Sequence, residues 1–254
     1  MSAAVVLTLA HAPDHALVAD CIAADRFASC SSKEIAELPM LHGGRSARLG
    51  DFFQVKGERV ARVRIAGDLR RVEGIGAGMA GGELVIEGSV GRDLGRALAG
   101  GTIDVRGDAG DNAGGALPGA SRGMTGGEIV IRGSAGADAG ARMRRGLIVV
   151  TGAAAERAGH GMIAGTVLLC GAAGRGTGRW TRRGTIVALA PIERPATFRY
   201  ACTYRPPHLR LLFAHLARRH DLAVAERYVT GRYDRYSGDL AELGKGEILQ
   251  WAGA

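Results

Sequence analysis

Between Gly82 and Arg183 the sequence repeats one glycine-framed pattern five times, and this repeat constrains the fold more than any other feature. The steps between the glycines that open successive copies are 19, 26, 19, 19 and 19 residues. These glycines are Gly82, Gly101, Gly127, Gly146, Gly165 and Gly184. A nearly constant period indicates units that stack on one another, each contacting only its neighbours.

Each copy starts with an alternating run typical of a β-strand, as in GELVIEG. Because alternate side chains of a strand share a face, equivalent positions of successive copies should form columns. Two columns expected to face inward are wholly apolar, namely Leu84, Ile103, Ile129, Ile148, Val167, Ile186 and Ile86, Val105, Ile131, Val150, Leu169, Ala188. A third, Met79, Leu98, Met124, Met143, Met162, Thr181, would fill the space opposite the strands.

Two further glycines recur in every copy, one directly after the strand and one seven residues later. They are Gly88, Gly107, Gly133, Gly152, Gly171 and Gly95, Gly114, Gly140, Gly159, Gly178. Only glycine adopts positive φ at little cost, so both sets predict sharp corners with positive φ, and this glycine density excludes a helix. The sequence therefore predicts a mainly β chain built on a single-stranded parallel β-helix of about six turns of 19 residues.

The segments on either side of the repeat predict three regions: a small N-terminal cap over 1–60, the β-helix over 61–192, and a helical C-terminal tail over 193–254. The cap should contain a strand at Val5 to Leu9 and a short helix capped by Ser31 and Glu34. The one longer step contains GGALPGASRG, which predicts a loop bulging from one face.

The outward position at the middle of each strand is also mostly aliphatic. Its members are Val85, Asp104, Val130, Val149, Leu168 and Val187. An apolar stripe on the outside of a stack implies a cover. Two covers fit: a partner subunit, or the chain's own helix after Pro206 and Pro207, whose apolar residues Leu209, Leu212, Phe213 and Leu216 form one stripe.

Composition narrows the class of protein without defining its role. The net charge of +8 favours an acidic partner. Sparse aromatic residues and the lack of a nucleic-acid-binding signature argue against nucleic acid. No apolar run is long enough for a membrane span and no secretion signal opens the chain, so we expect a cytoplasmic protein. Four scattered cysteines, with no CxxC pair, argue against a disulfide framework or a zinc site.

Few residues of the sequence look suited to catalysis or to metal binding. His11 and His15 flank Pro13, which disfavours a continuous helix, and the five-residue spacing of His215 and His220 should point the two side chains apart. We therefore predict no metal site and no catalytic residue in this chain.

One histidine, His160, lies within the repeat at a predicted corner. Its position permits an acyltransferase base, as in enzymes built from hexapeptide repeats, but a period of 19 residues is not built from sixes. A solvated corner residue is the simpler interpretation. GxGxxG-like strings lack the strand, turn and helix that a dinucleotide site requires.

The Gly-x-x-Gly-x-x-x-Gly spacing, the Met before the closing glycines and the Ile-x-Ile strands resemble the GXGXG β-helix domain. That domain is known from the large subunit of glutamate synthase and from the C subunit of formylmethanofuran dehydrogenase. The segments GDFFQVKG at 50–57, MRRG at 143–146, MIAGT at 162–166 and GDLAELGKGEIL at 238–249 are similar to this C subunit. The likeness is greatest to the form found in methylotrophic bacteria.

This resemblance implies a non-catalytic subunit of a formyltransferase/hydrolase complex with four subunit types, which takes part in formaldehyde oxidation. The implied partners are a formyltransferase subunit, an amidohydrolase-like hydrolase subunit and a further dehydrogenase-related subunit. The complex would move a formyl group from formyltetrahydromethanopterin to methylofuran and release formate. A molybdenum or tungsten formylmethanofuran dehydrogenase is the alternative, and a structural domain like that of glutamate synthase is a more distant one.

Methylofuran-type carriers have acidic, glutamate-rich tails, which suggests a role for a group of arginines late in the repeat. Arg144, Arg145, Arg182 and Arg183 occupy the same two columns two turns apart, with Arg175 and Arg179 nearby. We predict that the first four help to hold such a tail. The alternative is that they are solvated or face another subunit.

Overall fold

The computed structural model describes residues 4–253, which form a mainly β molecule with few helices. Twelve strands make one continuous sheet, in the order β14-β15-β16-β13-β12-β11-β10-β9-β8-β6-β1-β5, and four make a second sheet, β4-β3-β2-β7. Within these residues no helix is long and apolar enough to cross a membrane.

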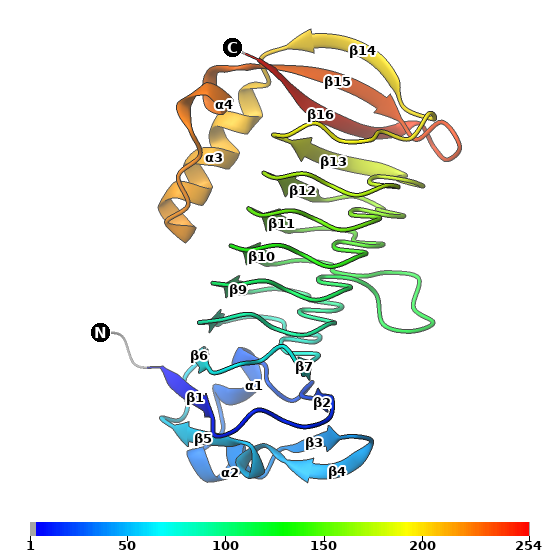
Figure 1. Ribbon diagram of the computed structural model, residues 1–254. Coiled ribbons are helices and arrows are strands. Elements are labelled where there is room, and N and C mark those ends of the chain that lie inside the picture. Colours follow the sequence, from blue (N-terminus) through cyan, green and yellow to red (C-terminus); the bar gives the residue numbers. More distant parts are fainter. Residues whose placement is uncertain (1–3, 254) are drawn as a thin grey trace.

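The repeated copies form a stack of parallel turns, here called rungs, each running from one opening glycine to the next (Figure 1). Each strand pairs in parallel with the equivalent residues of the next, as in Ile129 with Ile148 and Ile148 with Val167. A second parallel ladder of single bridges follows the strands and joins Leu69 through Val90, Ala109, Ala135, Ala154 and Ala173 to Ile192. The strands of the stack are β6 (Arg62–Ala66), β8 (Glu83–Ile86), β9 (Thr102–Val105), β10 (Glu128–Ile131), β11 (Leu147–Val150), β12 (Thr166–Leu169) and β13 (Arg183–Ala188).

The interior of the stack is the set of columns expected from the alternation. Every residue of the two wholly apolar columns and of the third, methionine-rich column is at most 1% exposed. Thr181, the one polar member, donates its hydroxyl to the carbonyl of Gly178 at 2.7 Å. The predicted columns are therefore confirmed as a buried and almost wholly apolar interior.

The repeated glycines serve two purposes, which corrects the expectation that both corner sets need positive φ. The opening glycines and the later corner set do have positive φ, for example Gly101 at 79° and Gly140 at 73°. The set directly after the strands does not. There the backbones of successive rungs approach so closely that a Cβ on Gly152 would lie 2.7 Å from the carbonyl carbon of Gly133, so space rather than φ requires glycine.

The N-terminal region closes one end of the stack and continues its sheet. β1 (Val5–Leu9) pairs in parallel with β6, as a rung does, and in antiparallel with β5 (Phe53–Lys56). The predicted capping box is present, since Ser31 and Glu34 bond reciprocally at the start of α2. The other elements are β2 (Leu17–Val18), α1 (Ala24–Phe27), α2 (Ser32–Ala36), β3 (Pro39–His42), β4 (Arg45–Arg48), a 3₁₀ turn (Leu49–Asp51) and β7 (Val72–Glu73).

The C-terminal region contains more strand than the expected helical tail. β14 (Arg199–Tyr204), α3 (Pro207–His220), α4 (Glu226–Thr230), β15 (Arg232–Gly238) and β16 (Lys245–Gly253) follow the last rung. β16 pairs in parallel with β13, and β15 and β14 extend the sheet in antiparallel. Because a stack of rungs leaves an unpaired strand at its end, β16 takes the place of one further rung.

Helix α3 lies along the outside of the stack and covers the apolar outward stripe (Figure 1). Leu209, Phe213 and Leu216 of α3 pack with Val130, Val149, Leu168 and Val187 in one buried cluster. Of the two covers left open by the sequence, the chain's own helix is therefore the one observed. The 26-residue step forms a loop that protrudes from the stack between β9 and β10 (Figure 1).

Candidate functional site

The structure brings the four predicted arginines to one depression on the stack. Arg144 and Arg145 precede β11, and Arg182 and Arg183 lie two rungs further on, at the start of β13. The amide of Ile163 donates to the carbonyl of Met143, and that of Arg182 to Met162, both at 2.8 Å, which aligns these corners. All four arginines line a cavity of about 710 Å³, together with Leu243 and the rung between them.

Most of these arginines are available for a ligand. All four are exposed, and among residues 4–253 Arg144, Arg145 and Arg183 form no ion pair with a carboxylate. Arg182 is the exception, since its Nε lies 3.2 Å from Glu242. Three uncompensated guanidinium groups around one depression favour an anion with several carboxylates over a neutral ligand.

The depression continues into two others, which share lining residues and form what we call the arginine groove. A cavity of about 270 Å³ shares Ile163 and Arg182 with the first. It shares His160 and Trp180 with a third cavity of about 740 Å³. The groove contains nine arginines against four acidic residues; the arginines are Arg142, Arg144, Arg145, Arg157, Arg175, Arg179, Arg182, Arg183 and Arg194.

Three of the groove arginines are held by other side chains. Arg157 makes two hydrogen bonds to Asp138, at 2.9 and 2.6 Å, and this partner raises its pKa. Arg182 pairs with Glu242, and Arg194 stacks over the ring of Tyr236 at 3.7 Å. The neighbours expected from sequence, Arg175 and Arg179, do line the groove. It is therefore a basic surface whose charge is only partly neutralised.

An exposed aromatic side chain, Trp180, lies in the middle of the groove and was not among the residues predicted from sequence. It is 49% exposed and has φ of 63°, at a corner where the preceding rungs carry Gly161 and Arg142. Its ring lies 4.9 Å from that of His160 and 5.3 Å from the guanidinium of Arg179. A tryptophan in a column of glycine and arginine is the sequence signal that could have found this surface.

His160 lies in the arginine groove with its side chain partly buried. Burial is the main cause that lowers its pKa, and the neighbouring arginines lower it further against the opposing effect of Asp138. Its Nδ1 is buried without a hydrogen-bond partner. It is thus partly buried rather than a freely solvated corner residue.

The expectation that His215 and His220 point apart is wrong. Nε2 of His215 lies 2.9 Å from Oε1 of Glu128, and Nε2 of His220 lies 2.5 Å from Oε2 of the same carboxylate. The two imidazole rings are 5.9 Å apart. The five-residue spacing suggested divergence on a regular helix, but α3 ends at His220, and both side chains reach one strand residue.

A second cluster of this kind lies near the N-terminus and is more exposed. Asp14, His15 and His42 come within ion-pair distance, with His42 Nε2 and His15 Nδ1 both contacting Oδ1 of Asp14 at 2.7 and 3.2 Å. The ring of His11 lies 6.0 Å from that of Phe52. No histidine pair forms between His11 and His15.

The fold and the groove define a class of protein: a mainly β stack of parallel rungs with a basic groove on its outer face. No family model matches the chain. The chain is similar over 96% of its length, and over 98% of the other chain, to a chain in the crystal structure of the formyltransferase/hydrolase complex FhcABCD from Methylorubrum extorquens in complex with methylofuran. The two share 34% identity and superpose with a TM-score of 0.79.

Curated relatives match a shorter part of the chain. The C subunit of the tungsten-containing formylmethanofuran dehydrogenase 2 from Methanothermobacter thermautotrophicus is 34% identical over 96 residues, 36% of each chain. The C subunit of the molybdenum-containing formylmethanofuran dehydrogenase 1 from Methanosarcina barkeri is 38% identical over 94 residues, 35% of this chain and 31% of the relative. The matched region spans about a third of the length of these curated relatives.

The chain belongs to the same family as the matched chain of the FhcABCD complex, and about a third of it is homologous to C subunits of formylmethanofuran dehydrogenases.

Proposed function

We propose that this chain is the non-catalytic C subunit of a formyltransferase/hydrolase complex. The observation that carries the proposal is the full-length likeness to the FhcABCD chain, at 34% identity and a TM-score of 0.79. The likeness to subunits of the metal-containing dehydrogenases covers about a third of the chain. In this role the chain holds the partner subunits that catalyse the two reactions in the cytoplasm. One partner transfers a formyl group from formyltetrahydromethanopterin to methylofuran, and the other hydrolyses the formyl product to release formate.

The architecture supports a scaffold. Two parallel ladders, one of strands and one of single bridges, support a single-stranded parallel β-helix of the GXGXG type. We place this β-helix at 61–192, between a cap at 1–60 and a tail at 193–254. Each rung is bonded to both neighbours, so the stack is a stiff spacer. A carrier tethered between two active sites gains effective concentration only when its reach matches their fixed separation. We therefore expect the isolated chain to show neither transferase nor hydrolase activity in a direct assay of each.

The arginine groove is the part of this surface suited to a carrier with an acidic tail such as methylofuran. Arg144 and Arg145 are separated by one rung from Arg182 and Arg183, about 10 Å at the usual strand spacing. Single exposed pairs contribute only about 0–1 kcal/mol each, so the tail would be held by several arginines together. Arg175, Arg179 and the ring of Trp180 extend the contact surface along the groove.

Reversing four charges tests this role in the assembled complex. With the predicted arginines changed to glutamate, we expect most carrier to be lost on gel filtration, because attraction becomes repulsion at every anchoring position. The matched control makes the same change in charge at four exposed arginines that lie outside the groove and form no ion pair within residues 4–253, namely Arg45, Arg59, Arg210 and Arg218. Carrier content is measured by mass spectrometry of the denatured complex. Equal retention in both variants, with all subunits still present, would contradict tail binding by these arginines.

A metal-containing formylmethanofuran dehydrogenase is the second candidate, since both curated relatives named above belong to such enzymes. Co-purification distinguishes the two. A formyltransferase and an amidohydrolase-like chain are expected to accompany an affinity-tagged copy of this chain from its native host. Recovery of a chain carrying a molybdenum or tungsten pterin instead would favour the dehydrogenase. A structural domain of the glutamate synthase kind is the third candidate and predicts neither partner.

A further inference from the structure

Three potential metal ligands meet where α3 contacts the stack, and none of them lines the arginine groove. Glu128 is the first residue of β10, while His215 and His220 belong to the last part of α3. Both histidines direct Nε2 at the same carboxylate, each at a different oxygen. The nearest ligand atoms of the three side chains all lie within 4.8 Å of one another. Residues 87 and 92 positions apart in sequence thus converge on one point.

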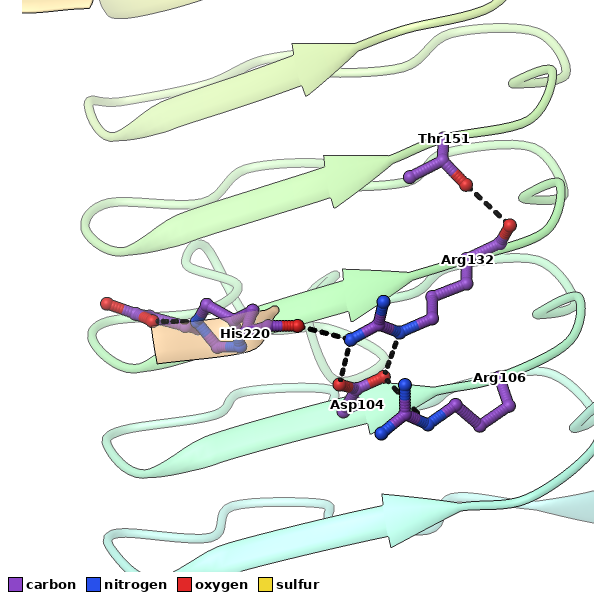
Figure 2. A network of polar contacts seen from close by, with 6 residues as sticks. Asp104, Arg106, Arg132, Thr151 and His220 are labelled. Atoms are coloured by element: carbon purple, nitrogen blue, oxygen red, sulfur yellow. Dashed lines mark hydrogen bonds and ion pairs between the residues drawn. The ribbon is translucent and has the colours of Figure 1, made fainter. Parts of the chain in front are cut away.

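The position of His220 is fixed by polar contacts that span two rungs. Figure 2 shows the guanidinium of Arg132 lying between the carboxylate of Asp104 and the main-chain carbonyl of His220. The two hydrogen bonds from Arg132 to Asp104 are 3.0 and 2.8 Å. Asp221 then ends the helix in the left-handed region at φ 50°. The contact from Arg132 therefore holds the last residue of α3 through its backbone carbonyl. The imidazole of His220 is not used in this contact and points to Glu128.

The three ligands differ in exposure in a way that suits a site loaded from solvent. The side chain of His220 is 4% exposed and that of Glu128 25%, whereas His215 is 45% exposed. Two ligands are thus held in place, and the third lies at the open side. Arg132, which contacts the main-chain carbonyl of His220, pairs with Asp104, and Asp104 also lies 3.8 Å from Arg106. A zinc ligand set of one carboxylate and two imidazoles carries a single negative charge, because histidine binds a metal in its neutral form.

Two imidazole nitrogens and one carboxylate are a ligand set that Zn²⁺ takes in proteins, with a fourth position left to water or another ligand. Ligand distances near 2.0–2.1 Å in a tetrahedron place ligand atoms about 3.3 Å apart. Since the three atoms already lie within 4.8 Å, closing on an ion needs only small rotations of the side chains. The rival cluster is less suited, because Asp14 and His15 are 74% and 68% exposed and both histidines there contact one oxygen.

We propose that Glu128, His215 and His220 form a zinc-binding site that fastens the end of α3 to the rung of β10. On binding, each imidazole gives up the Nε2 proton that it donates to the carboxylate, either to its own Nδ1 or to solvent, and its Nε2 then coordinates the ion. The two Nε2 atoms and a carboxylate oxygen of Glu128 supply three coordination bonds. Because the ligands come from a helix and a strand that no covalent link holds together locally, binding requires the docked helix and stabilises it by mass action. The ion thereby stabilises the packing of α3 over the apolar outward stripe.

Zinc binding is measured on the full chain without a polyhistidine tag, after removal of metal with a chelator. Titration with zinc chloride against a chromophoric zinc indicator is expected to show one tight site per chain. Thermal unfolding with and without zinc chloride is expected to show a higher melting temperature with the ion bound. Loading with Co²⁺ is expected to give the visible absorption of a tetrahedral site, without the charge-transfer band that a cysteine ligand produces.

Three single variants separate this site from others. His215→Ala removes the most exposed ligand and leaves the buried part of α3 intact, so the variant should fold. Affinity should fall by at least about tenfold, since losing a residue that merely orients a zinc ligand already costs about 10–100-fold. His208→Ala, at an exposed position of the same helix, and His15→Ala, in the rival cluster, should leave affinity unchanged. Absence of a stoichiometric site, or equal affinity in His215→Ala, would overturn the proposal.

Discussion

Replacing Gly101 with alanine is expected to destabilise the chain by about 2–5 kcal/mol. Gly101 has φ of 79°, where a side chain costs about 1–2 kcal/mol. The new Cβ would also lie 2.7 Å from the carbonyl oxygen of Gly82 and 2.8 Å from the carbonyl carbon of Gly81. Both contacts are backbone of the rung beneath, so relief requires the rungs to move apart, and overpacking of this kind adds about 1–3 kcal/mol.

A matched control separates the two costs. Gly119 has nearly the same φ, 76°, but a Cβ built on it meets no atom within 4 Å. Gly119→Ala should therefore show the backbone strain alone, reduced by the lower entropy of the unfolded chain, and cost about 1 kcal/mol or less. The free energies of unfolding come from urea titrations monitored by circular dichroism. If the two variants lose equal stability, close rung spacing is not what requires glycine at Gly101.

The interior of the stack was predictable from sequence because its determinants repeat. Each column recurs six times with a single chemical character, so an error at one position is corrected by the others. The role of the glycines after the strands was less visible. A glycine needed for φ and a glycine needed for space look alike in a sequence. The close approach of Gly152 to Gly133 depends on the rung spacing that forms only after folding.

The two ends of the chain were harder to predict because nothing in them repeats. The capping box at Ser31 and Glu34 lies within four residues and was found. The pairing of β16 with β13 joins residues about 60 positions apart, and β14 joins the sheet by pairing with β15. Such pairings follow from the need to cover the open edge of the last rung, which a reading of local periodicity does not include.

The functional residues divide in the same way. The proximity of the four groove arginines was predictable, because they occupy equivalent positions in rungs of known period. They are Arg144, Arg145, Arg182 and Arg183. The cluster of Glu128 with His215 and His220 was not predictable. It joins a repeat position to the end of a helix outside the repeat, and its geometry depends on where α3 stops and on the contact from Arg132.

The docking of α3 provides the second large expected effect. Leu216 is fully buried against the outward stripe, whereas Leu211, on the same helix, is 75% exposed. Truncating a buried leucine to alanine costs about 2–5 kcal/mol, because apolar contacts are lost and a cavity remains. Leu216→Ala should lose that much stability, and Leu211→Ala should stay within about 0.5 kcal/mol of the parent chain.

The same pair of variants reports what the helix covers. Weakened docking in Leu216→Ala should expose Val130, Val149, Leu168 and Val187 part of the time, and so increase the fluorescence of a dye that binds apolar surface. Leu211→Ala has the same change in composition on the same helix, and we expect no increase for it. If both variants behave like the parent chain in unfolding and in dye binding, α3 does not cover the stripe in the free chain. The alternative cover, a partner subunit, would then have to supply the apolar contacts that the stripe requires.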